Sequence, residues 1–561
     1  MHSATQNPSI LPPNFTLPEV NFSAALPSIL PTNVAALTAL LHAQQAVHLA
    51  AQQAILNSFE DQTALFSRQV RDYINHLIEQ FILARHRYFG ISSEQISGQG
   101  RLFDEAEVLA AESSEAQDIA PIPPVVPGAG KPAVKARGKR TPLPAELPRI
   151  EIVHDVPKAE RTCNCGTPMV VIGQEVSEQL DIVPMQVRVL RHIRNTYGCP
   201  ESIHAPVTAA LPAQPLPKSN ASPDFLAMLL IVKFIDGLPL ARFEYVLDRH
   251  GVKVPRQTLA RWVIGASQLL QPLHNLMRDT LFDGPFMHMD ETVVQVLKEK
   301  GKQPTSNSYM WVQSGGPPGK PVVIYDYDPS RSSEVPVRLL QGYQGYLMTD
   351  GYDGYNKLAK TDGIERLVCW AHVRRRFVEA TRVQPKGKQG RADEAVALIG
   401  KLYGIEREHK DATDAARYQA RQQHSLSALD ELHAWLEKTL PAVTPKSALG
   451  TALSYMRDYW SMLTRYTERG DLPIDNNRCE NAIRPFVIGR KAWLFSDTPA
   501  GANASAIIYS LLQTAKANGQ EPYTWLRRVM RDLPAAKTVE EIEVLLPWNL
   551  HAMDLTSEMA S

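Results

Sequence analysis

Three carboxylates in this 561-residue chain have the residue types and settings that phosphoryl transfer by two metal ions requires. Asp290 lies in FMHMDETVVQVL, whose alternating apolar residues predict a β-strand. Asp350 follows a short predicted strand, Tyr346 to Thr349, and precedes a glycine turn. Glu480 stands in a helical pattern, IDNNRCENAIRPFVIGRKAWLFS. Carboxylate oxygens are hard ligands for Mg²⁺ or Mn²⁺, and two ions about 3.5–4 Å apart can activate an attacking oxygen and stabilise a leaving one.

We therefore expect Asp290, Asp350 and Glu480 to bind two Mg²⁺ or Mn²⁺ ions, with each aspartate placed where a strand becomes a loop. Without bound cations, three clustered carboxylates should repel one another and raise at least one pKa. A lone helical glutamate is more often a solvated residue, so the prediction depends on all three. The neighbouring acids Glu291, Asp353 and Glu379 are interpreted as supporting or surface residues.

The predicted helix around Glu480 has two faces. Its polar face carries Asn476, Asn477, Glu480, Asn481 and Arg484, and its apolar face carries Cys479, Ile483 and Phe486. We expect Asp475 to be the N-cap and Pro485 to end or kink the helix, or to begin a new one. Asn476 and Asn477 are candidates for orienting Glu480. Arg484, Arg490 and Lys491 form a basic group that suits phosphate.

Four long motifs together indicate a family. The chain reads DET at Asp290, TDGYDGYN around Asp350, CWAHVRRRF from Cys369, and NNRCENAIRPFVIGRKAWLFS around Glu480. In order and wording they resemble the DDE transposases of the insertion sequence 66 family, from ARHRYFGISSEQ near Arg85 to EIEVLLPW at its end. The resemblance implies a bacterial DNA transposition and recombination enzyme that binds insertion-sequence ends and catalyses metal-dependent strand cleavage and strand transfer. It also implies a ribonuclease-H-like α/β core.

Two other functions stay open at this point. One is a non-catalytic, sequence-specific DNA-binding protein, such as a regulator or an inactivated transposase descendant. The other is a ribonuclease-H-like nuclease that only hydrolyses. All three carboxylates are present, which argues against decay of the site. Pre-cut 3′-OH ends separate the two enzymes, because only a transposase joins them to target DNA.

Composition gives an ordinary globular chain. Lys and Arg together number 59, as do Asp and Glu, so any DNA contact must use local basic patches rather than net charge. The N-terminus lacks a basic lead before an apolar core, and the apolar run from Phe225 to Ile235 is too short to span a bilayer. Five cysteines favour thiols or a metal site over a disulfide framework. We predict a cytoplasmic, DNA-associated protein without a membrane partner.

The N-terminal part divides by composition into three segments. Residues 1–33 are predicted to be disordered, and residues 91–148 to be an acidic, then basic, Pro/Gly-rich linker. Between them, residues 34–90 are proline-free and helix-favouring. Their heptad-spaced residues are Phe59, Thr63, Phe66, Val70, Tyr73, Leu77 and Ala84. This spacing fits either an oligomerising coiled coil or an amphipathic helix packed on its own chain. The resemblance favours a homo-oligomer, at least a dimer on DNA, and allows small accessory transposition proteins.

Residues 149–206 are predicted to form a small β-rich module with strands at IEIVH, MVVIG and VRVLRHIR. The resembling family often has a zinc-finger-like domain here, built from two cysteine pairs. This chain departs from that pattern, because Cys163 and Cys165 are separated by one residue and Ser202 stands where a partner for Cys199 is expected. His204 is a possible substitute ligand. Zinc stays doubtful, and ordinary buried cysteines are the favoured alternative.

Residues 220–280 have the layout of a helix-turn-helix, with helices Leu240 to Arg249 and Arg256 to Ser267 around a glycine turn. Arg256, Gln257 and Thr258 are placed to reach base edges, and Arg261 to meet phosphate. Plain packing of a helix pair is the alternative. Three residues should face the core: Leu259, Trp262 and Val263.

The rest of the chain predicts the catalytic core with a mixed sheet and a helical insertion. Residues 284–385 form its first part, 386–470 the insertion, 471–518 the second part with Glu480, and 519–561 a C-terminal helical segment. Arg374, Arg375 and Arg376 are either a solvated stripe or a DNA-backbone contact. The insertion serves either as a scaffold or as a grip on DNA.

Overall fold

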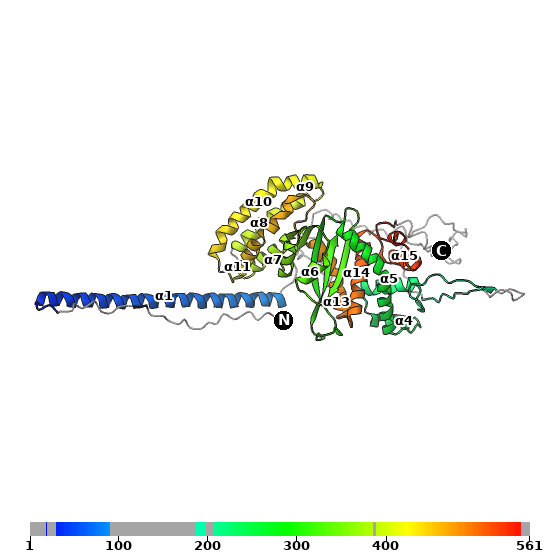
Figure 1. Cartoon of the computed structure of the whole chain (residues 1–561), viewed down its shortest axis with the longest axis horizontal. Coiled ribbons are helices and arrows are strands. Elements are labelled where there is room, and N and C mark those ends of the chain that lie inside the picture. Colours follow the sequence, from blue (N-terminus) through cyan, green and yellow to red (C-terminus); the bar gives the residue numbers. More distant parts are fainter. Residues whose placement is uncertain (1–17, 20–29, 90–186, 198–206, 385–388, 551–561) are drawn as a thin grey trace, which may run out of the picture. The chain divides into compact units, whose positions relative to one another are not determined.

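The computed structural model describes residues 18–19, 30–89, 187–197, 207–384 and 389–550 (Figure 1). Two compact units are distinguished, Met1–Ser92 with His192–Ser561, and Ser93–Arg191. The expected disordered N-terminus lies mostly outside the described residues. The expected linker lies wholly outside them, as does most of the β-rich module. The elements named below belong to the first unit.

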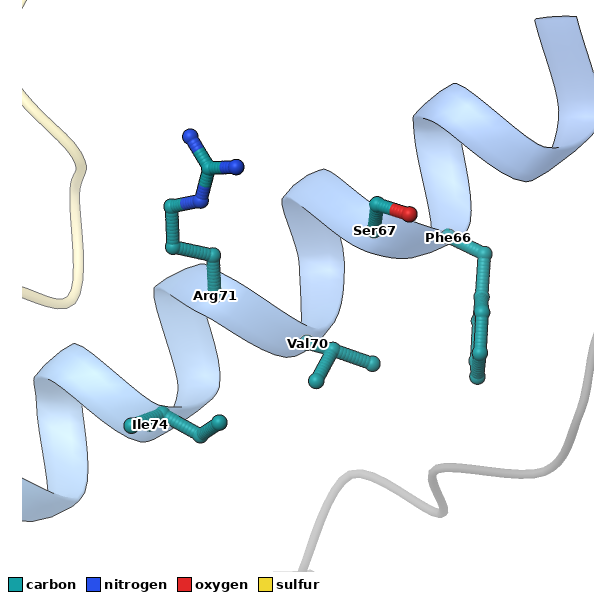
Figure 2. A pocket seen from close by; sticks show the side chains of 5 residues that line it. All are labelled: Phe66, Ser67, Val70, Arg71 and Ile74. Carbon is teal, nitrogen blue, oxygen red and sulfur yellow. The ribbon is translucent and has the colours of Figure 1, made fainter.

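Helix α1 (Val34–Phe89) confirms the long N-terminal helix. Many of its large apolar side chains are exposed, among them Leu49, Phe59 and Phe81. Figure 2 shows Phe66, Val70 and Ile74 along this helix together with Ser67 and Arg71. By length and composition alone, Val34–Arg85 is also long and apolar enough to cross a membrane: an 18-residue window within it has a mean hydropathy of 1.2, and 6% of that window is buried. The coiled coil stays a prediction.

Three helices follow a short hairpin. Strands β1 (Thr196–Tyr197) and β2 (Val207–Thr208) pair antiparallel, whereas residues 187–195 form no strand, so the strand predicted at VRVLRHIR is wrong. Helix α3 (Pro223–Phe234) begins at an N-cap serine, and α4 (Leu240–Arg249) has the predicted bounds. Helix α5 (Arg256–Phe282) runs well past the predicted end at Ser267, because apolar residues at helical spacing continue to be buried: Leu270, Leu273, Met277 and Leu281.

The packing of this helix pair is close to the prediction. Leu259 and Val263 are buried, as expected. Trp262 is only partly buried, because it covers the edge of the core and meets Phe225 edge-on with ring centroids 5.7 Å apart.

A mixed five-stranded sheet forms the centre of the unit. Its strands are β3 (Phe286–Gln295), β4 (Asn307–Gly315), β5 (Val322–Asp328), β6 (Gly345–Thr349) and β7 (Ile364–Val368). Their order is β5-β4-β3-β6-β7; β4 pairs antiparallel with both β5 and β3, whereas β3, β6 and β7 run parallel to one another. Helix α6 (Glu334–Leu339) connects β5 to β6, and the 3₁₀ helix η2 (Asp353–Lys360) connects β6 to β7. The mixed sheet is confirmed.

The edge strand β5 is covered by helix α14 (Pro499–Ala517), most of whose residues are buried. Ser510 and Thr514 accept hydrogen bonds from the backbone N–H groups of Tyr325 (2.7 Å) and Val323 (3.0 Å). These bonds satisfy donors that an exposed edge would offer to another chain. Helices α15 (Pro522–Asp532) and α16 (Val539–Glu543) follow, as predicted.

The stretch between β7 and Glu480 is helical. After α7 (Trp370–Thr381) come α8 (Arg391–Glu408), α9 (Asp414–Ala420), a π-helical turn (Arg421–Ser425), α10 (Leu426–Thr439), α11 (Ala448–Asp458) and α12 (Trp460–Thr464). Leu402, Leu429, Leu432 and Leu436 are buried in one cluster that includes Trp370 and Phe377 of α7. This shared core attaches the helical stretch to the end of the sheet, and so to the site described next.

Candidate functional site

Asp290 lies inside β3 rather than at its end, so the predicted strand-to-loop position is wrong. Strand β3 continues to Gln295 because β4 pairs with it throughout, with Asp290 opposite Val312. The parallel pairing with β6 stops earlier, at His288 opposite Met348. Continuing that register by two residues places Asp290 next to Asp350. The sheet therefore opens between β3 and β6 at these two aspartates.

Asp350 directly follows β6, as predicted, and its backbone is firmly held. The buried Arg366 on β7 donates to the Asp350 carbonyl (2.7 Å), to Thr349 Oγ1 (2.8 Å) and to Asn356 Oδ1 (2.8 Å). The Asp350 carboxylate accepts from the Tyr352 N–H at 3.0 Å. At Gly351 a Cβ would stand 2.3 Å from the ring of Tyr455, so only glycine fits at this turn.

Glu480 is in the first turn of α13 (Asn477–Trp493). The N-cap is Asn476, not Asp475, because Asn476 is fully buried and bonded to the sheet. Its Nδ2 donates to the Met289 carbonyl (3.1 Å), and its Oδ1 lies 2.9 Å from Nδ1 of His288. Since Met289 precedes Asp290, these bonds fix the start of α13 beside the first aspartate.

Helix α13 continues through Pro485 to Trp493, so the prediction that the helix ends or begins anew at this proline is wrong, and a kink there stays a prediction. Its apolar face is as expected, with Cys479, Ile483 and Phe486 buried. Burial of this face against the sheet holds the helix together despite the backbone hydrogen bond that proline cannot make.

The pKa of Asp290 responds to the charges of the other two carboxylates. Burial raises the pKa of Asp290 well above its ordinary value, and the negative charges of Glu291, Asp350 and Glu480 raise it further. A raised pKa of this origin is what clustered carboxylates without cations should have. The three carboxylates are hard oxygen donors on three segments. Asp290 and Asp350 lie where the sheet opens between β3 and β6, and their negative charges repel each other. A group of this kind suits Mg²⁺ or Mn²⁺.

Glu291 is a buried, paired residue rather than a surface acid, which corrects part of its interpretation. Its side chain is 2% exposed and lies 2.5 Å from the guanidinium of Arg331. The Tyr355 hydroxyl donates to its other oxygen. Burial raises the pKa of Glu291, whereas Tyr355 and Arg331 act in the opposite direction. This network attaches η2 and the loop after β5 to β3 next to Asp290.

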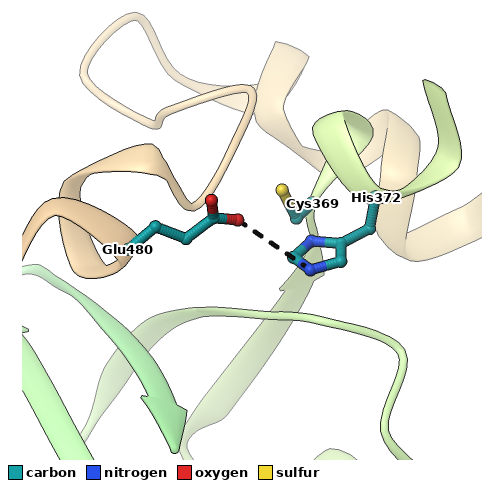
Figure 3. Close-up of side chains that lie close together, drawn as sticks. All are labelled: Cys369, His372 and Glu480. Carbon is teal, nitrogen blue, oxygen red and sulfur yellow. Dashed lines mark ion pairs between the residues drawn. The ribbon is translucent and has the colours of Figure 1, made fainter. Parts of the chain in front are cut away.

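The start of α7 meets Glu480, which the sequence did not predict (Figure 3). His372 Nε2 lies 3.8 Å from Glu480 Oε1, and Arg375 lies 3.7 Å from Glu480 Oε2. Cys369, at the N-cap of α7, completes a group whose ligand atoms all lie within 4.8 Å of one another. Burial and the charge of Arg375 lower the pKa of His372. The Cys-x-x-His spacing in CWAHVRRRF was the available signal.

The predicted DNA contacts are distributed over several elements. Arg256, Gln257 and Arg261 are exposed at the start of α5, and Thr258 is partly buried beside them. On α7, Arg375 lies at Glu480, whereas Arg376 stacks on Tyr455 at 4.1 Å.

On α13, Arg490 donates to Thr292 Oγ1 (3.1 Å) and to the Val293 carbonyl, so its guanidinium already holds the helix to β3. Lys491 is exposed and Arg484 is partly buried. The doubtful zinc ligands Cys163, Cys165 and Cys199 lie outside the described residues.

Comparison with known proteins gives consistent matches along the chain. A model of the transposase IS66 family matches residues 218–504, and one of the IS66 C-terminal element matches residues 510–548. Further models match residues 160–201, a zinc-finger binding domain of transposase IS66, and residues 76–152, described as transposase C of IS166 homeodomain.

Similar proteins occur in Sinorhizobium fredii strain NGR234. The uncharacterized protein y4qI is 32% identical over 428 residues, covering 73% of this chain and 78% of its own. The uncharacterized protein y4jD is 30% identical over 422 residues, covering 73% and 82%. With its core, C-terminal element and N-terminal segments all matched by models of one family, the chain belongs to the IS66 transposase family.

Proposed function

We propose that this protein is a DDE transposase that binds the ends of an insertion sequence and catalyses DNA strand cleavage and strand transfer. The observation that carries the proposal concerns Asp290, Asp350 and Glu480, which come from three distant segments. They lie close enough for the charges of Asp350 and Glu480 to raise the pKa of Asp290. The sheet order supports it, because three antiparallel strands followed on one side by two parallel ones are expected of a ribonuclease-H-like core.

Asp290, Asp350 and Glu480 would hold two Mg²⁺ or Mn²⁺ ions. When bound, such ions supply Lewis-acid activation of the attacking oxygen and stabilisation of the leaving one. The protein's own contribution is to hold the three carboxylates in position. Asn476 fixes the start of α13 against β3, and Arg366 fixes the backbone of Asp350. Arg375 provides a cation beside Glu480 where a phosphate of the bound strand would lie.

The proposed reaction consists of two in-line displacements at phosphorus. In the first, water attacks the phosphodiester at the element end, one P–O bond forms as another breaks, and a 3′-OH is released. In the second, this 3′-OH attacks a target phosphodiester and displaces a target 3′-oxygen. Each step exchanges one P–O bond for another, so neither an oxidant nor a covalent enzyme intermediate is needed.

DNA binding is assigned to the helix-turn-helix and to cations around the site. Arg256, Gln257 and Thr258 would read base edges from the start of α5, with Arg261 on phosphate. Near the carboxylates, the phosphate contacts would come from Arg374, Arg375, Arg484, Arg490 and Lys491. Replacing one of these phosphate-binding cations should make DNA binding less dependent on salt, with the slope falling by about one for each cation replaced.

The domain organisation follows the family. Residues 34–90 would join protomers through α1, residues 149–206 would form the zinc-finger-like module, and residues 220–280 the DNA-binding domain. Residues 284–385 and 471–518 would make the catalytic core, with 386–470 inserted between them. We infer a homo-oligomer in the bacterial cytoplasm that acts on double-stranded DNA, with accessory transposition proteins as possible partners.

The proposal is tested by cleavage and joining of labelled DNA carrying the ends of the encoding element. Glu480→Gln should abolish both reactions in Mg²⁺ or Mn²⁺ while leaving end binding nearly unchanged. The matched control is Glu437→Gln, the same chemical change at an exposed position on α10, which should retain wild-type rates.

Three outcomes distinguish the candidate functions. Joining of pre-cut 3′-OH ends by the wild type but not by Glu480→Gln supports the transposase. Cleavage without any joining of pre-cut ends would instead assign a nuclease. Specific end binding with neither reaction, even with accessory proteins present, would assign a DNA-binding protein.

A further inference from the structure

Two buried polar atoms at Glu480 lack a hydrogen-bond partner within the part of the chain that the structure describes. They are Nδ1 of His372 and Oε1 of Glu480. Oε1 lies 3.8 Å from the other ring nitrogen of His372, too far for a hydrogen bond. Sγ of Cys369 lies within 4.8 Å of both residues' ligand atoms (Figure 3). Because buried polar atoms are normally paired, this group indicates a missing ligand.

We propose that Cys369, His372 and Glu480 bind a metal ion of the Zn²⁺ class, at a site distinct from the Mg²⁺ site but sharing Glu480 with it. Thiolate, imidazole and carboxylate are all ligands of Zn²⁺, whereas Mg²⁺ takes oxygen ligands. Metal–ligand bonds of about 2.0–2.3 Å put the ligand atoms of a tetrahedral ion roughly 3.3–3.7 Å apart. The observed limit of 4.8 Å therefore requires only a small side-chain rotation.

The elements around the group decide which ligand moves. Cys369 is held from both sides, since its N–H donates to the Thr349 carbonyl (3.0 Å) and its Sγ accepts from the Asn476 N–H (3.1 Å). His372 follows three residues later on the same face of α7. Glu480 has a long side chain with one unpartnered oxygen. An ion bound here would thus draw the Glu480 carboxylate toward α7.

Competition between the two kinds of metal follows from the shared carboxylate. A Zn²⁺-class ion on Cys369 and His372 would remove Glu480 from Asp290 and Asp350, and so would inhibit cleavage. Three protein ligands also leave a fourth position open, unlike the closed sites with four protein ligands that structural zinc occupies. The binding itself stands on the geometry alone, whereas the inhibition rests on the proposed function.

Direct metal binding provides the first test. The five cysteines of the chain are Cys163, Cys165, Cys199, Cys369 and Cys479, so replacing the first three by serine in the full-length protein leaves only the two buried thiols of the core. Cd²⁺ titration of this variant should produce the ultraviolet charge-transfer band of a cadmium–thiolate bond. The band should disappear on further Cys369→Ser replacement and persist in Cys479→Ser, the matched buried thiol outside the group.

Two further ligand variants test the site independently in case Cys369→Ser misfolds. His372→Ala, at a side chain that is 21% exposed, and Glu480→Gln should each weaken Cd²⁺ binding at least about tenfold, since even outer contacts of metal ligands cost 10–100-fold. The site is overturned if no band forms, if the band survives Cys369→Ser, or if binding is unchanged in His372→Ala and Glu480→Gln.

The inhibition has its own test. Zn²⁺ added to the Mg²⁺ cleavage assay should inhibit the wild type, and Cys369→Ser should require at least about tenfold more Zn²⁺ for the same inhibition. Equal sensitivity of both proteins would overturn the competition. A cadmium band that depends on Cys369, together with no cleavage by any protein, would leave the metal site standing and refute the proposed transposase activity.

Discussion

Replacing Asp290 by asparagine should separate the electrostatic cost of the carboxylate cluster from its chemistry. In the metal-free protein, burial and the charges of Glu291, Asp350 and Glu480 raise the pKa of Asp290 well above its ordinary value. The unfolded chain has no such environment, so there the group titrates near about 3.9. Between these two pKa values, the folded protein keeps a proton that the unfolded chain has already released.

The sign of the pH dependence follows from this extra proton. The free energy of unfolding should fall as pH rises from about 4 toward the folded pKa, by up to about 1.4 kcal/mol per pH unit for one proton. At pH values below the unfolded pKa, both states are protonated and the loss is absent. Over each pH unit of that range, a loss of this size corresponds to roughly 3–6 °C in Tm for a domain of 150–250 residues.

In Asp290→Asn, the free energy of unfolding should not decrease with rising pH in this way, and the variant should be unable to cleave DNA. The assay is thermal unfolding of the metal-free full-length protein at pH 5, 6 and 7, with a control, Asp362→Asn, at an exposed aspartate in the turn before β7. The control should follow the wild type, and Asp290→Asn should show a flatter pH dependence and the higher Tm at pH 7. Added Mg²⁺ should raise the Tm of the wild type and of the control only. A pH slope equal to that of the wild type, or a lower Tm at pH 7, would refute the reasoning.

Three further substitutions test buried contacts, two beside the site and one in the helical insertion. Asn476→Ala should lower the free energy of unfolding by about 2–4 kcal/mol in urea denaturation, because it leaves His288 and a strand carbonyl unpaired in the core. Arg366→Met should raise the Mg²⁺ concentration needed for half-maximal cleavage by about 10–100-fold, with end binding nearly unchanged, since it frees the Asp350 backbone. Arg421→Met should lower the free energy of unfolding by about 3–5 kcal/mol in the same measurement. It leaves the Glu406 carboxylate without the two hydrogen bonds, of 2.7 and 2.8 Å, that Arg421 donates to it. An effect below about 1 kcal/mol in the first or third variant, or an unchanged Mg²⁺ requirement in the second, would contradict these roles.

The strands and helices of the core were predictable because each carries its own local pattern. Strand β5 begins with an unbroken apolar run, Val322 to Tyr325, that is buried throughout, and the helical spacing of Cys479, Ile483 and Phe486 reflects burial of one helix face. The predicted ends of elements were wrong where contacts with residues far away in the sequence determine how far a strand or helix extends. Strand β3 extends past Asp290 because β4 pairs with it, and α13 passes Pro485 because its apolar face is buried against the sheet.

The candidate site was predictable only in its residue types. Three carboxylates in recognisable motifs gave the proposed ligand set, but the contacts that position Glu480 join segments more than a hundred residues apart. Asn476 bonds to residues 187 and 188 positions earlier, and no local pattern in the sequence encodes that. His372 and Arg375 likewise meet Glu480 only through the packing of α7 beside α13.

The site concentrates negative charge and surrounds it with positive groups that do not neutralise it. Glu480 lies in the first turn of α13, where the helix dipole favours an anion. Arg366 and Arg375 lie behind Asp350 and beside Glu480, yet the pKa of Asp290 stays raised. In the proposed transposase, bound cations would relieve this repulsion, and cation binding would then stabilise the region that joins β3, β6 and α13. Because Glu480 could not serve an ion on Cys369 and His372 and an ion on Asp290 and Asp350 in the same position, the two kinds of metal should stabilise different positions of the Glu480 side chain.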